Sequence, residues 1–374
     1  MELSEKLQIP IIITGLAKGV VPDDFPANLG SAYRASSKTA YEFMGVTDLV
    51  ISIGANYPFA RVEYDTHAFK YIQVEADTAK FGRHHTLDYG VWSDAKAFIQ
   101  KMLDRSQTVT PNGYYKAAQE ATKDWHAYLD HLMNRTDGPA QFEPLYKQIN
   151  RVAEDDAIFS VDVGDNTINS FRFLKMNPKQ KLVTSGLFAT MGCGIPGAMA
   201  AKLSFPERQA WNIAGDGAFA MVMQDMLTEK KYNLPIINIV TSNTVLSFIR
   251  SEQEDVPQPL YGIDLEDADY AKIAEAMGVK GITVKTVAEL PAAFDEAIAT
   301  VKAGQPVLID VKMTPRRSIP VEDLVVRENG QDHVTEDVNG VTHKTTGSIE
   351  DFLKKYDAVG LKPLSYYFEK NNVH

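Results

Sequence analysis

Asp216 and Asn243 are the two side chains whose types and spacing most clearly indicate chemistry. Asp216 lies between two glycines, directly after the apolar run WNIAG, and Asn243 directly follows a second apolar run, PIINIVTS. The residues between the two runs are enough for one helix. Because parallel strands joined through a helix end at the same edge of a sheet, we expect these two side chains to lie close together. A carboxylate and an amide oxygen are ligands that a hard divalent cation accepts.

The segment that follows Asp216 also suits a diphosphate. Gly215 and Gly217 allow the backbone to turn sharply and to approach a ligand closely. A helix is predicted to start near Phe219, and its free N–H groups and positive dipole end favour phosphate oxygens. Its predicted buried stripe is Phe219, Val222, Met223, Met226 and Leu227. Gly-Asp-Gly alone is typical of an ordinary turn, but the whole strand-helix-strand pattern indicates a diphosphate site.

Three hard oxygen ligands are predicted for one magnesium ion. They are the carboxylate of Asp216, the side-chain amide of Asn243 and the backbone carbonyl of Val245. Two diphosphate oxygens and a water would complete the octahedron that Mg²⁺ demands.

Composition excludes several classes of protein. The 374 residues are 44% hydrophobic and 23% charged, which is ordinary for a globular protein with two or three domains. The net charge of −11, with no basic block, argues against a nucleic-acid or anionic-membrane partner. Cys193 is the single cysteine, so no disulfide framework is possible within the chain and a reducing, cytoplasmic location is expected. Core packing is the simplest interpretation of Cys193.

The uncharged stretch 182–201 raises the question of a membrane span. It contains four glycines and a proline, so we predict a buried loop and helix instead. The N-terminus has no apolar signal core.

A first domain is predicted over residues 1–105, where short apolar runs alternate with helical segments. This alternation is typical of a parallel sheet covered on both faces. The predicted strands are 9–14, 48–54, 70–75 and 89–92, and the predicted helices are 37–44 and 94–103.

A second domain is predicted over residues 141–315, after a linker, 106–140, that carries a long surface helix over 114–133. Its predicted strands are 157–161, 209–214, 235–241, 280–284 and 306–312, and its clearest helix is 288–302. The tail, 316–374, is polar and irregular, with helices predicted over 348–356 and 363–371. The fold class is therefore α/β, with two doubly wound parallel-sheet domains and a C-terminal helical tail.

With these motifs the chain resembles the thiamine diphosphate enzymes, most closely the pyruvate oxidases of lactic acid bacteria. The resemblance rests on FSVDVGDNTINSFRFLK, TSGLFATMGCGIPGAMAAKL, the Gly215–Asn243 motif and LSFIRSEQED. AKGVVPDDFPANLGSAYR, SIGANYPFA and the C-terminal KPLSYY extend it over essentially the whole chain. Individual motifs are shared with acetolactate synthase and related decarboxylases.

The resemblance implies roles around thiamine diphosphate. Met191 would be the apolar wedge that bends the cofactor. Its residue type alone favours a simpler role, which is to fill a gap in the hydrophobic core. The residues that would contact the pyrimidine, the diphosphate or the metal are Ala189, Thr190, Met191, Asp216, Gly217, Ala218, Asn243, Thr244, Val245, Leu246, Ser247 and Phe248. The residues that would face the substrate are Phe248, Ile249 and Glu252.

The first domain resembles an FAD domain. The resemblance implies flavin nucleotide contacts from Ser31, Ala32, Tyr33, Arg34, Gly54, Ala55, Asn56, Tyr57, Pro58, Glu75 and Asp77. An acid at a strand end, such as Glu75 or Asp77, can accept a hydrogen bond from a ribose hydroxyl, but solvated loop acids are an equal interpretation without the resemblance.

Two departures from the family pattern bear on activity. The usual Asn-Asn pair is Ser242-Asn243 here, which keeps the metal-binding second residue. Nothing in the sequence corresponds to the family's N-terminal pyrimidine-binding domain, which supplies the glutamate that protonates the cofactor, nor to the first strand and helix of the FAD domain. We therefore expect this polypeptide alone to be inactive or weak, and FAD binding to be doubtful.

The resemblance implies a complete reaction that converts pyruvate, phosphate and O₂ to acetyl phosphate, CO₂ and H₂O₂. The implied partners are these small molecules and either a homo-oligomer or a chain that carries the N-terminal domain. Two alternatives stay open: an acetolactate synthase-like enzyme, in which FAD has no redox part, and a non-catalytic module that binds cofactor or pairs with another chain.

Overall fold

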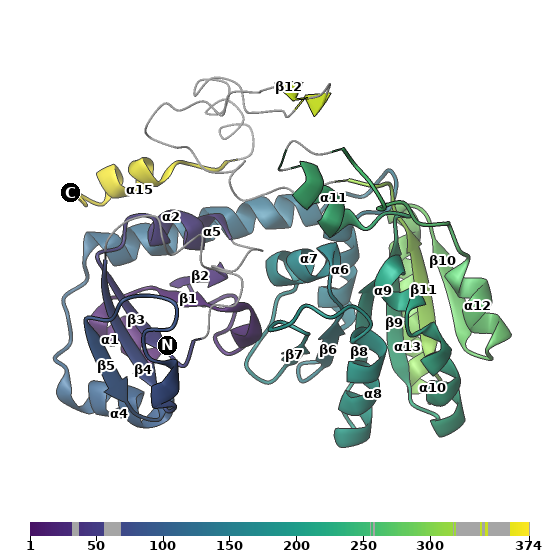
Figure 1. The fold of residues 1–374 in the computed structure, drawn as a ribbon, viewed down its shortest axis with the longest axis horizontal. Helices are drawn as coiled ribbons and strands as arrows, with labels where there is room; N and C mark the ends of the chain where they lie inside the picture. Colours follow the sequence, from purple (N-terminus) through teal and green to yellow (C-terminus); the bar gives the residue numbers. More distant parts are fainter. Residues whose placement is uncertain are drawn as a thin grey trace. The chain divides into compact units, whose positions relative to one another are not determined.

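The computed structural model describes residues 1–31, 37–55, 69–254, 256, 259–316, 318, 337–338, 341–342 and 360–373. These residues pack as two units (Figure 1). The first contains residues 1–128 and 360–373, and the second contains residues 129–318 and the short antiparallel pair β12 (Asp337–Val338) and β13 (Val341–Thr342). No helix of the described part is long and apolar enough to cross a membrane.

The second unit is built on a parallel sheet of six strands in the order β10-β11-β9-β8-β6-β7 (Figure 1). The strands are β6 (Ile158–Val161), β7 (Lys181–Val183), β8 (Ala210–Gly215), β9 (Ile236–Ser242), β10 (Lys280–Val284) and β11 (Val307–Lys312). Five of them confirm the predicted strands within a residue at each end. β7 was not predicted, because three residues at an exposed edge do not form the apolar run that identifies a buried strand.

Helices cover both faces of this sheet. One layer contains α8 (Gly194–Ser204), α9 (Asp216–Ala220), α10 (Met226–Tyr232) and α12 (Tyr270–Ala276), which share a buried cluster with Ala214, Val240 and Leu308 of the strands. The other contains α6 (Phe142–Val152), α7 (Asp165–Phe173) and α13 (Leu290–Lys302). Phe294 of α13 stacks on Trp211, whose side chain points away from the α8 layer since successive strand residues alternate.

The predicted helix after Asp216 is wrong in its form. The chain forms α9, then the 3-10 turn η3 (Met223–Asp225), and then α10. Because the helix is interrupted, one 3.6-residue period does not run through it. Phe219 and Met226 are buried as predicted, but Leu227 is 53% exposed.

The first unit contains two parallel sheets in the described residues, where the sequence predicted one. β1 (Ile11–Ile13) pairs with β2 (Asn28–Ser31), and β3 (Leu49–Ile53), β4 (Lys70–Glu75) and β5 (Tyr89–Trp92) form the other. The sequence NLGS of β2 was not predicted as a strand, because Asn and Gly are depleted in strands. The remaining helices are α1 (Glu2–Leu7), α2 (Lys38–Met44), α4 (Ala95–Arg105) and α15 (Leu364–Lys370), and there are short 3-10 turns η1 (Gly15–Ala17) and η2 (Thr78–Lys80). The predicted helix 348–356 lies outside the described residues.

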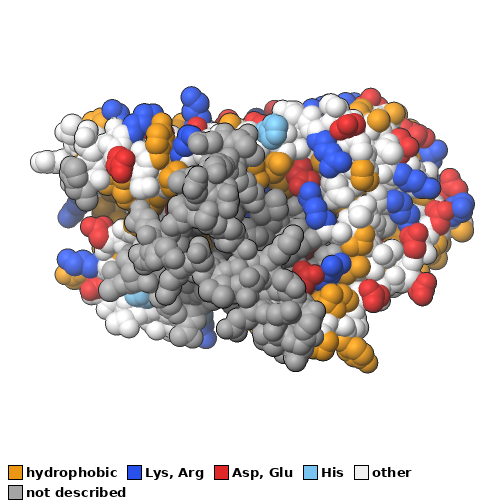
Figure 2. Space-filling model, turned by 90° about the horizontal axis from the view of Figure 1, so that it is seen from above, with side chains coloured by type: hydrophobic (Ala, Val, Ile, Leu, Met, Phe, Trp, Pro, Cys, Tyr) orange, Lys and Arg blue, Asp and Glu red, His pale blue; other side chains and the backbone are white. Residues whose placement is uncertain are grey.

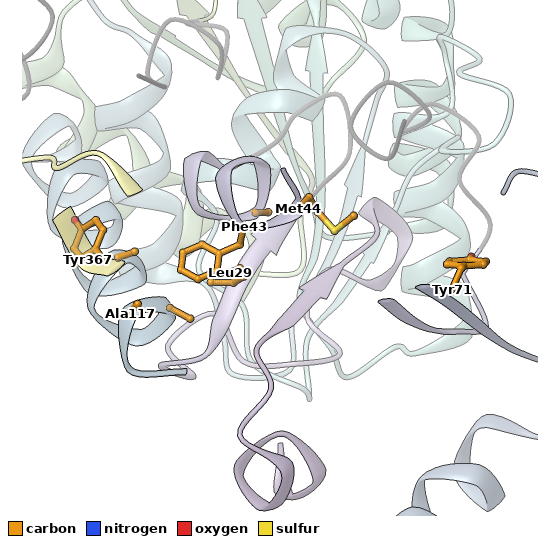
Figure 3. Close-up of a cluster of buried hydrophobic side chains, with 9 residues drawn as sticks. Leu29, Phe43, Met44, Tyr71, Ala117 and Tyr367 are labelled. Atoms are coloured by element: carbon orange, nitrogen blue, oxygen red, sulfur yellow. The ribbon is translucent and has the colours of Figure 1, made fainter. Parts of the chain in front are cut away.

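The long helix α5 (Gly113–Met133) is more buried than a surface helix. Ala117, Ala118 and Ala121 of α5 lie in the core of the first unit, together with Leu29, Phe43, Met44, Tyr71 and Tyr367 (Figure 3). Tyr367 of α15 also donates a hydrogen bond from its hydroxyl to Asp124 Oδ2 of α5, at 2.7 Å. The predicted helix is therefore present, but small alanines let it pack into a core where a surface helix was expected.

Candidate functional site

The predicted meeting of Asp216 and Asn243 is present in the structure. β8 and β9 are neighbours in parallel register, with Gly215 opposite Thr241, so the two residues follow adjacent strand ends. The Asp216 carboxylate accepts hydrogen bonds from the backbone N–H groups of Asn243, at 2.9 Å, and of Thr244, at 2.7 Å. Both side chains are buried. An acid and an amide are therefore held together at the carboxyl edge of the sheet.

Val245 belongs to the same hydrogen-bonded turn. Asn243 Oδ1 accepts from the Val245 N–H at 3.1 Å, and Asn243 Nδ2 donates to Ser247 Oγ at 2.8 Å. Ser247 Oγ in turn donates to the Val245 carbonyl at 3.3 Å. Thr244 has φ of 61°, a left-handed conformation that reverses the chain at this point. The three predicted oxygen groups therefore lie within one short turn.

The donor chemistry of this turn fits a hard divalent cation. Carboxylate, amide and carbonyl oxygens each have two lone-pair directions. Oδ2 of Asp216 uses both for the Asn243 and Thr244 N–H groups, whereas Asp216 Oδ1, Asn243 Oδ1 and the Val245 carbonyl each accept one hydrogen bond and keep one direction for a cation. Burial, the largest effect, raises the pKa of Asp216 above its ordinary value, and the hydrogen bonds from Thr244, Gly217 and Asn243 oppose that rise. A bound cation would favour the ionised form. Among the described residues, no group of three or more His, Cys, Asp and Glu side chains is placed to hold a metal ion. The predicted ligand set is of another kind, because Asp216 is its only member of these four residue types.

The two glycines beside Asp216 differ in whether the structure requires a residue without a side chain. Gly215 has φ of −74°, which any residue adopts, so the chain passes from β8 to α9 here without requiring a glycine. A Cβ on Gly217 would lie 2.8 Å from Leu246 Cδ2, 3.1 Å from Leu265 Cδ1 and 3.5 Å from Met191 Cε. Gly217 therefore leaves room for three neighbouring side chains, and the predicted close approach to a ligand stays a prediction. Sequence reasoning did not identify Leu265.

The same contact brings Met191 to the site. Met191 is half-buried in the loop between β7 and α8, beside the exposed Ala189 and Thr190. Ala189 has φ of 57°, and the Thr190 N–H donates to Ser185 Oγ at 3.0 Å. An apolar side chain from a segment distant in sequence therefore lies beside the Asp216 turn.

Asp162 holds this loop in place, and the sequence analysis gave it no role. It follows β6, which pairs with β8, and it is fully buried. Asp162 Oδ1 accepts from the N–H groups of Val163 and Gly192, at 2.8 and 2.9 Å, and Oδ2 accepts from the N–H of Gly194, at 2.8 Å. The sequence does contain a sign of this role, because Asp162 directly follows an apolar strand, as Asp216 does.

Cys193 lies in the same turn and is half-buried. Its Sγ is 3.7 Å from Asp162 Oδ1. Burial and the neighbouring carboxylate raise the pKa of the thiol to about 11, so it stays protonated and unreactive.

The predicted substrate-facing residues lie on α11 (Ser247–Glu254), directly after the turn. Phe248 and Glu252 are one helical turn apart and both half-buried, and Ile249 is 42% exposed. The turn itself is covered by residues 263–265. The Leu246 N–H donates to the Ile263 carbonyl and the Leu265 N–H to the Thr244 carbonyl, both at 2.8 Å.

Part of the predicted flavin site can be described in the first unit. Gly54 follows β3 with φ of 61°, and its N–H donates to the Val74 carbonyl of the neighbouring β4 at 2.9 Å, so Gly54 and Glu75 lie at one sheet edge. Glu75 is buried and accepts from the N–H groups of Ala76 and Asp77, at 3.0 and 3.3 Å.

The other predicted flavin contacts are less closely grouped. Asp77 caps the turn η2 by accepting from the Ala79 N–H at 3.0 Å, Ala55 is half-buried, and the buried Ser31 ends β2 in the separate two-stranded sheet. Ala32, Tyr33, Arg34, Asn56, Tyr57 and Pro58 lie outside the described residues.

The charged surface has no single sign on the face drawn in Figure 2. Lys and Arg side chains are interspersed with Asp and Glu over the described residues of that face. The described residues of that face therefore form no large region of a single charge sign.

Comparison with known proteins assigns both units to one group. Residues 162–311 match the family described as "Thiamine pyrophosphate enzyme, C-terminal TPP binding domain", and residues 1–102 match "Thiamine pyrophosphate enzyme, central domain". The chain is 40% identical to a pyruvate oxidase of Lactiplantibacillus plantarum over 374 residues, covering 99% of this chain and 59% of that protein.

More distant similarity extends to other proteins. A thiamine pyrophosphate-containing protein of Bacillus subtilis is 37% identical over 321 residues, covering 86% of this chain and 55% of that protein. An acetolactate synthase of Mycobacterium avium is 29% identical over 303 residues, covering 75% of this chain and 47% of that protein. The chain thus spans 47% to 59% of the length of these three relatives.

Proposed function

The chain belongs to the thiamine pyrophosphate enzymes, of which it contains the central and the C-terminal TPP binding domains, and we propose that it forms the corresponding part of a pyruvate oxidase. The reaction would convert pyruvate, phosphate and O₂ to acetyl phosphate, CO₂ and H₂O₂. The observation that carries the proposal is 40% identity to a pyruvate oxidase over 374 residues, with the Asp216–Asn243 turn formed at adjacent strand ends.

Magnesium and the cofactor diphosphate would be held at that turn. The Asp216 carboxylate, the Asn243 amide oxygen and the Val245 carbonyl would bind Mg²⁺, and the backbone beside Gly217 and Ala218 would lie against the diphosphate. The burial of Asp216 and Asn243 supports this assignment, because a charge pair in a water-poor site interacts more strongly than one in solvent.

Thiamine diphosphate, when bound, supplies the carbanion that attacks a 2-oxo acid. The protein supplies shape and orientation. Met191, beside Gly217, would support the cofactor, with Ala189 and Thr190 along its pyrimidine. Phe248, Ile249 and Glu252 of α11 would orient pyruvate, since this helix directly follows the metal turn.

The first unit would hold FAD as the acceptor of two electrons. We assign this role to Ser31–Arg34, Gly54–Pro58, Glu75 and Asp77, supported by the shared sheet edge of Gly54 and Glu75. We also propose a cytoplasmic, oligomeric protein.

The second candidate function is that of an acetolactate synthase, in which FAD has no redox part. The acetolactate synthases among the relatives, at 26% to 29% identity, favour this candidate.

Cofactor binding is the first test. Calorimetry should detect thiamine diphosphate binding to the chain only when Mg²⁺ is present. Asp216→Asn should weaken it at least about tenfold, because the amide lacks the negative charge that attracts the cation, and Asn243→Ala should do the same, because it removes a metal ligand. Asp155→Asn is the matched control, since Asp155 is exposed and remote in sequence from the turn. Equal binding by Asp216→Asn and the unchanged chain would contradict the proposed site.

The reaction is the second test. The chain should be assayed alone and after mixing with the part of the L. plantarum enzyme that it does not match. Pyruvate- and phosphate-dependent formation of H₂O₂ and acetyl phosphate supports the oxidase. Formation of acetolactate, with a flavin that pyruvate does not bleach under anaerobic conditions, would establish the synthase instead.

A further inference from the structure

Asp310 is a fully buried carboxylate on β11, outside every segment to which a role was assigned above. Its Oδ1 accepts a hydrogen bond from Ser242 Oγ at 2.6 Å. Its Oδ2 accepts from the Tyr270 N–H at 3.0 Å and lies 3.1 Å from Lys312 Nζ. A buried acid with three partners is held in one orientation and can fix the groups that it binds.

Two of these partners connect Asp310 to the Asp216–Asn243 turn, one to each of its two predicted side-chain ligands. Ser242 is the residue before Asn243. Tyr270, at the start of α12, donates from its hydroxyl to the backbone carbonyl of Asp216 at 3.3 Å. One carboxylate is therefore connected to both Asp216 and Asn243 through a single residue on each side.

The third partner fixes the segment that covers the turn. Lys312 Nζ also donates to Asp267 Oδ1 at 2.7 Å and to the Ala268 carbonyl at 2.5 Å. The same segment continues back to Leu265, whose N–H donates to the Thr244 carbonyl. The conformation of the turn, including the carbonyl of Val245, thus depends on contacts that meet at Asp310 and Lys312.

We propose that Asp310 is the positioning residue for the Asp216–Asn243 ligand pair, so that it sets the affinity for the divalent cation and the diphosphate without touching either. This inference rests on the proposed function, because it assumes that the turn binds metal and diphosphate. Substitution of a residue that hydrogen-bonds to a metal ligand, without binding the metal itself, typically weakens metal affinity by about 10- to 100-fold.

The test measures binding, independently of turnover. Mn²⁺ serves as the probe, its binding followed by electron paramagnetic resonance in the presence of thiamine diphosphate, and thermal unfolding is recorded without ligands. Asp310→Asn should weaken Mn²⁺ binding at least about tenfold, because the amide removes the charge opposite Lys312 and has an oxygen at only one of the two positions that face Ser242 and Tyr270. Glu229→Gln is the matched control: Glu229 is an equally buried acid of the same unit that bonds Asn238. It should leave Mn²⁺ affinity within about twofold.

Milder variants keep the test decisive if Asp310→Asn does not fold. Ser242→Ala and Tyr270→Phe each remove one link, and each should weaken Mn²⁺ binding several-fold. The double variant cuts both links between Asp310 and the ligand pair, so its Mn²⁺ affinity should fall below that of either single variant. Unchanged Mn²⁺ affinity in all three variants, with only a lower unfolding temperature, would overturn the inference. If the unaltered chain binds no Mn²⁺ with thiamine diphosphate, the proposed function itself fails, and this role fails with it.

Discussion

The side chain of Asp162 accepts a hydrogen bond from the backbone N–H of Gly194 at 2.8 Å, at the first residue of α8. The same carboxylate accepts from the N–H of Gly192 at 2.9 Å. It therefore fixes the loop that presents Met191 to the Asp216 turn, from a position directly after β6.

Replacing Asp162 with Asn should lower the free energy of unfolding by about 1–3 kcal/mol, because an amide cannot accept from all three N–H groups that the carboxylate binds. Denaturant titration of the two proteins measures this difference. Asp155→Asn, at an exposed position nearby in sequence, should change it by less than about 0.5 kcal/mol. Equal unfolding midpoints for Asp162→Asn and the unchanged chain would refute the anchoring role.

A Gly194→Ala substitution should be among the most damaging small changes in the second unit. The added Cβ would lie 2.2 Å from Asn212 Oδ1 and 2.9 Å from Asp162 Oδ2, and both of those side chains are fully buried. We expect a loss of about 3 kcal/mol, typical of overpacking in a rigid core.

Gly215→Ala is the matched control for Gly194→Ala. Gly215 has an ordinary φ of −74°, and its Cβ would be 3.8 Å from the nearest atom, Asn166 Oδ1. Its stability should change by less than about 1 kcal/mol. A larger loss in Gly215→Ala than in Gly194→Ala would contradict the packing described here.

Glu229 should make the stability of the second unit depend on pH. Burial raises its pKa from 4.5 to about 8, although the hydrogen bond from Asn238 opposes the rise and Asp225 adds to it. The folded state therefore holds a proton that the unfolded state releases between those two values. This contribution is fully present below pH 4.5 and is lost as pH rises through about 8, with each pKa unit equivalent to about 1.4 kcal/mol.

Thermal unfolding at a series of pH values checks this. Glu229→Gln keeps the size of the protonated side chain without the ionisation, so its stability should fall less between pH 5 and pH 8 than that of the unchanged chain. Glu207→Gln, at an exposed position, should retain the original slope. Parallel curves for all three proteins would show that Glu229 does not ionise in this range.

In the first unit, Lys38→Met should be strongly destabilising. Lys38 Nζ lies 2.6 Å from Glu42 Oε2, with both side chains buried, and it also donates to the Lys362 carbonyl at 2.8 Å. Burial raises the pKa of Glu42, and the positive charge of Lys38 opposes that rise. Without Lys38 the buried carboxylate has no opposite charge, so the free energy of unfolding should fall by about 3–5 kcal/mol.

Hydrogen exchange of α2 and α15 measures this effect. Protection should fall in Lys38→Met and return largely in the double variant Lys38→Met with Glu42→Leu, because no unpaired charge then remains. Lys96→Met, on an exposed position of α4, is the control. A double variant no better protected than Lys38→Met would argue against an unpaired charge as the cause.

Features that are local along the chain could be predicted from the amino-acid sequence alone. Strand boundaries followed from apolar runs, and the neighbourhood of Asp216 and Asn243 followed from one strand-helix-strand unit, since consecutive parallel strands end at the same edge. The same reasoning failed where a helix is interrupted, at Leu227, and where small residues pack, along α5. Periodicity reports which residues are apolar and does not report what packs against them.

The residues that support the Asp216–Asn243 turn could be identified only from the three-dimensional structure. Asp162 and Asp310 come from other strands, and Leu265 and Tyr270 come from the segment that covers the turn and from the helix that follows it. Their roles depend on sheet order, β11-β9-β8-β6, which places their strands beside β8 and β9. Sheet order is set by contacts between residues far apart in sequence, and no local pattern of side chains encodes it.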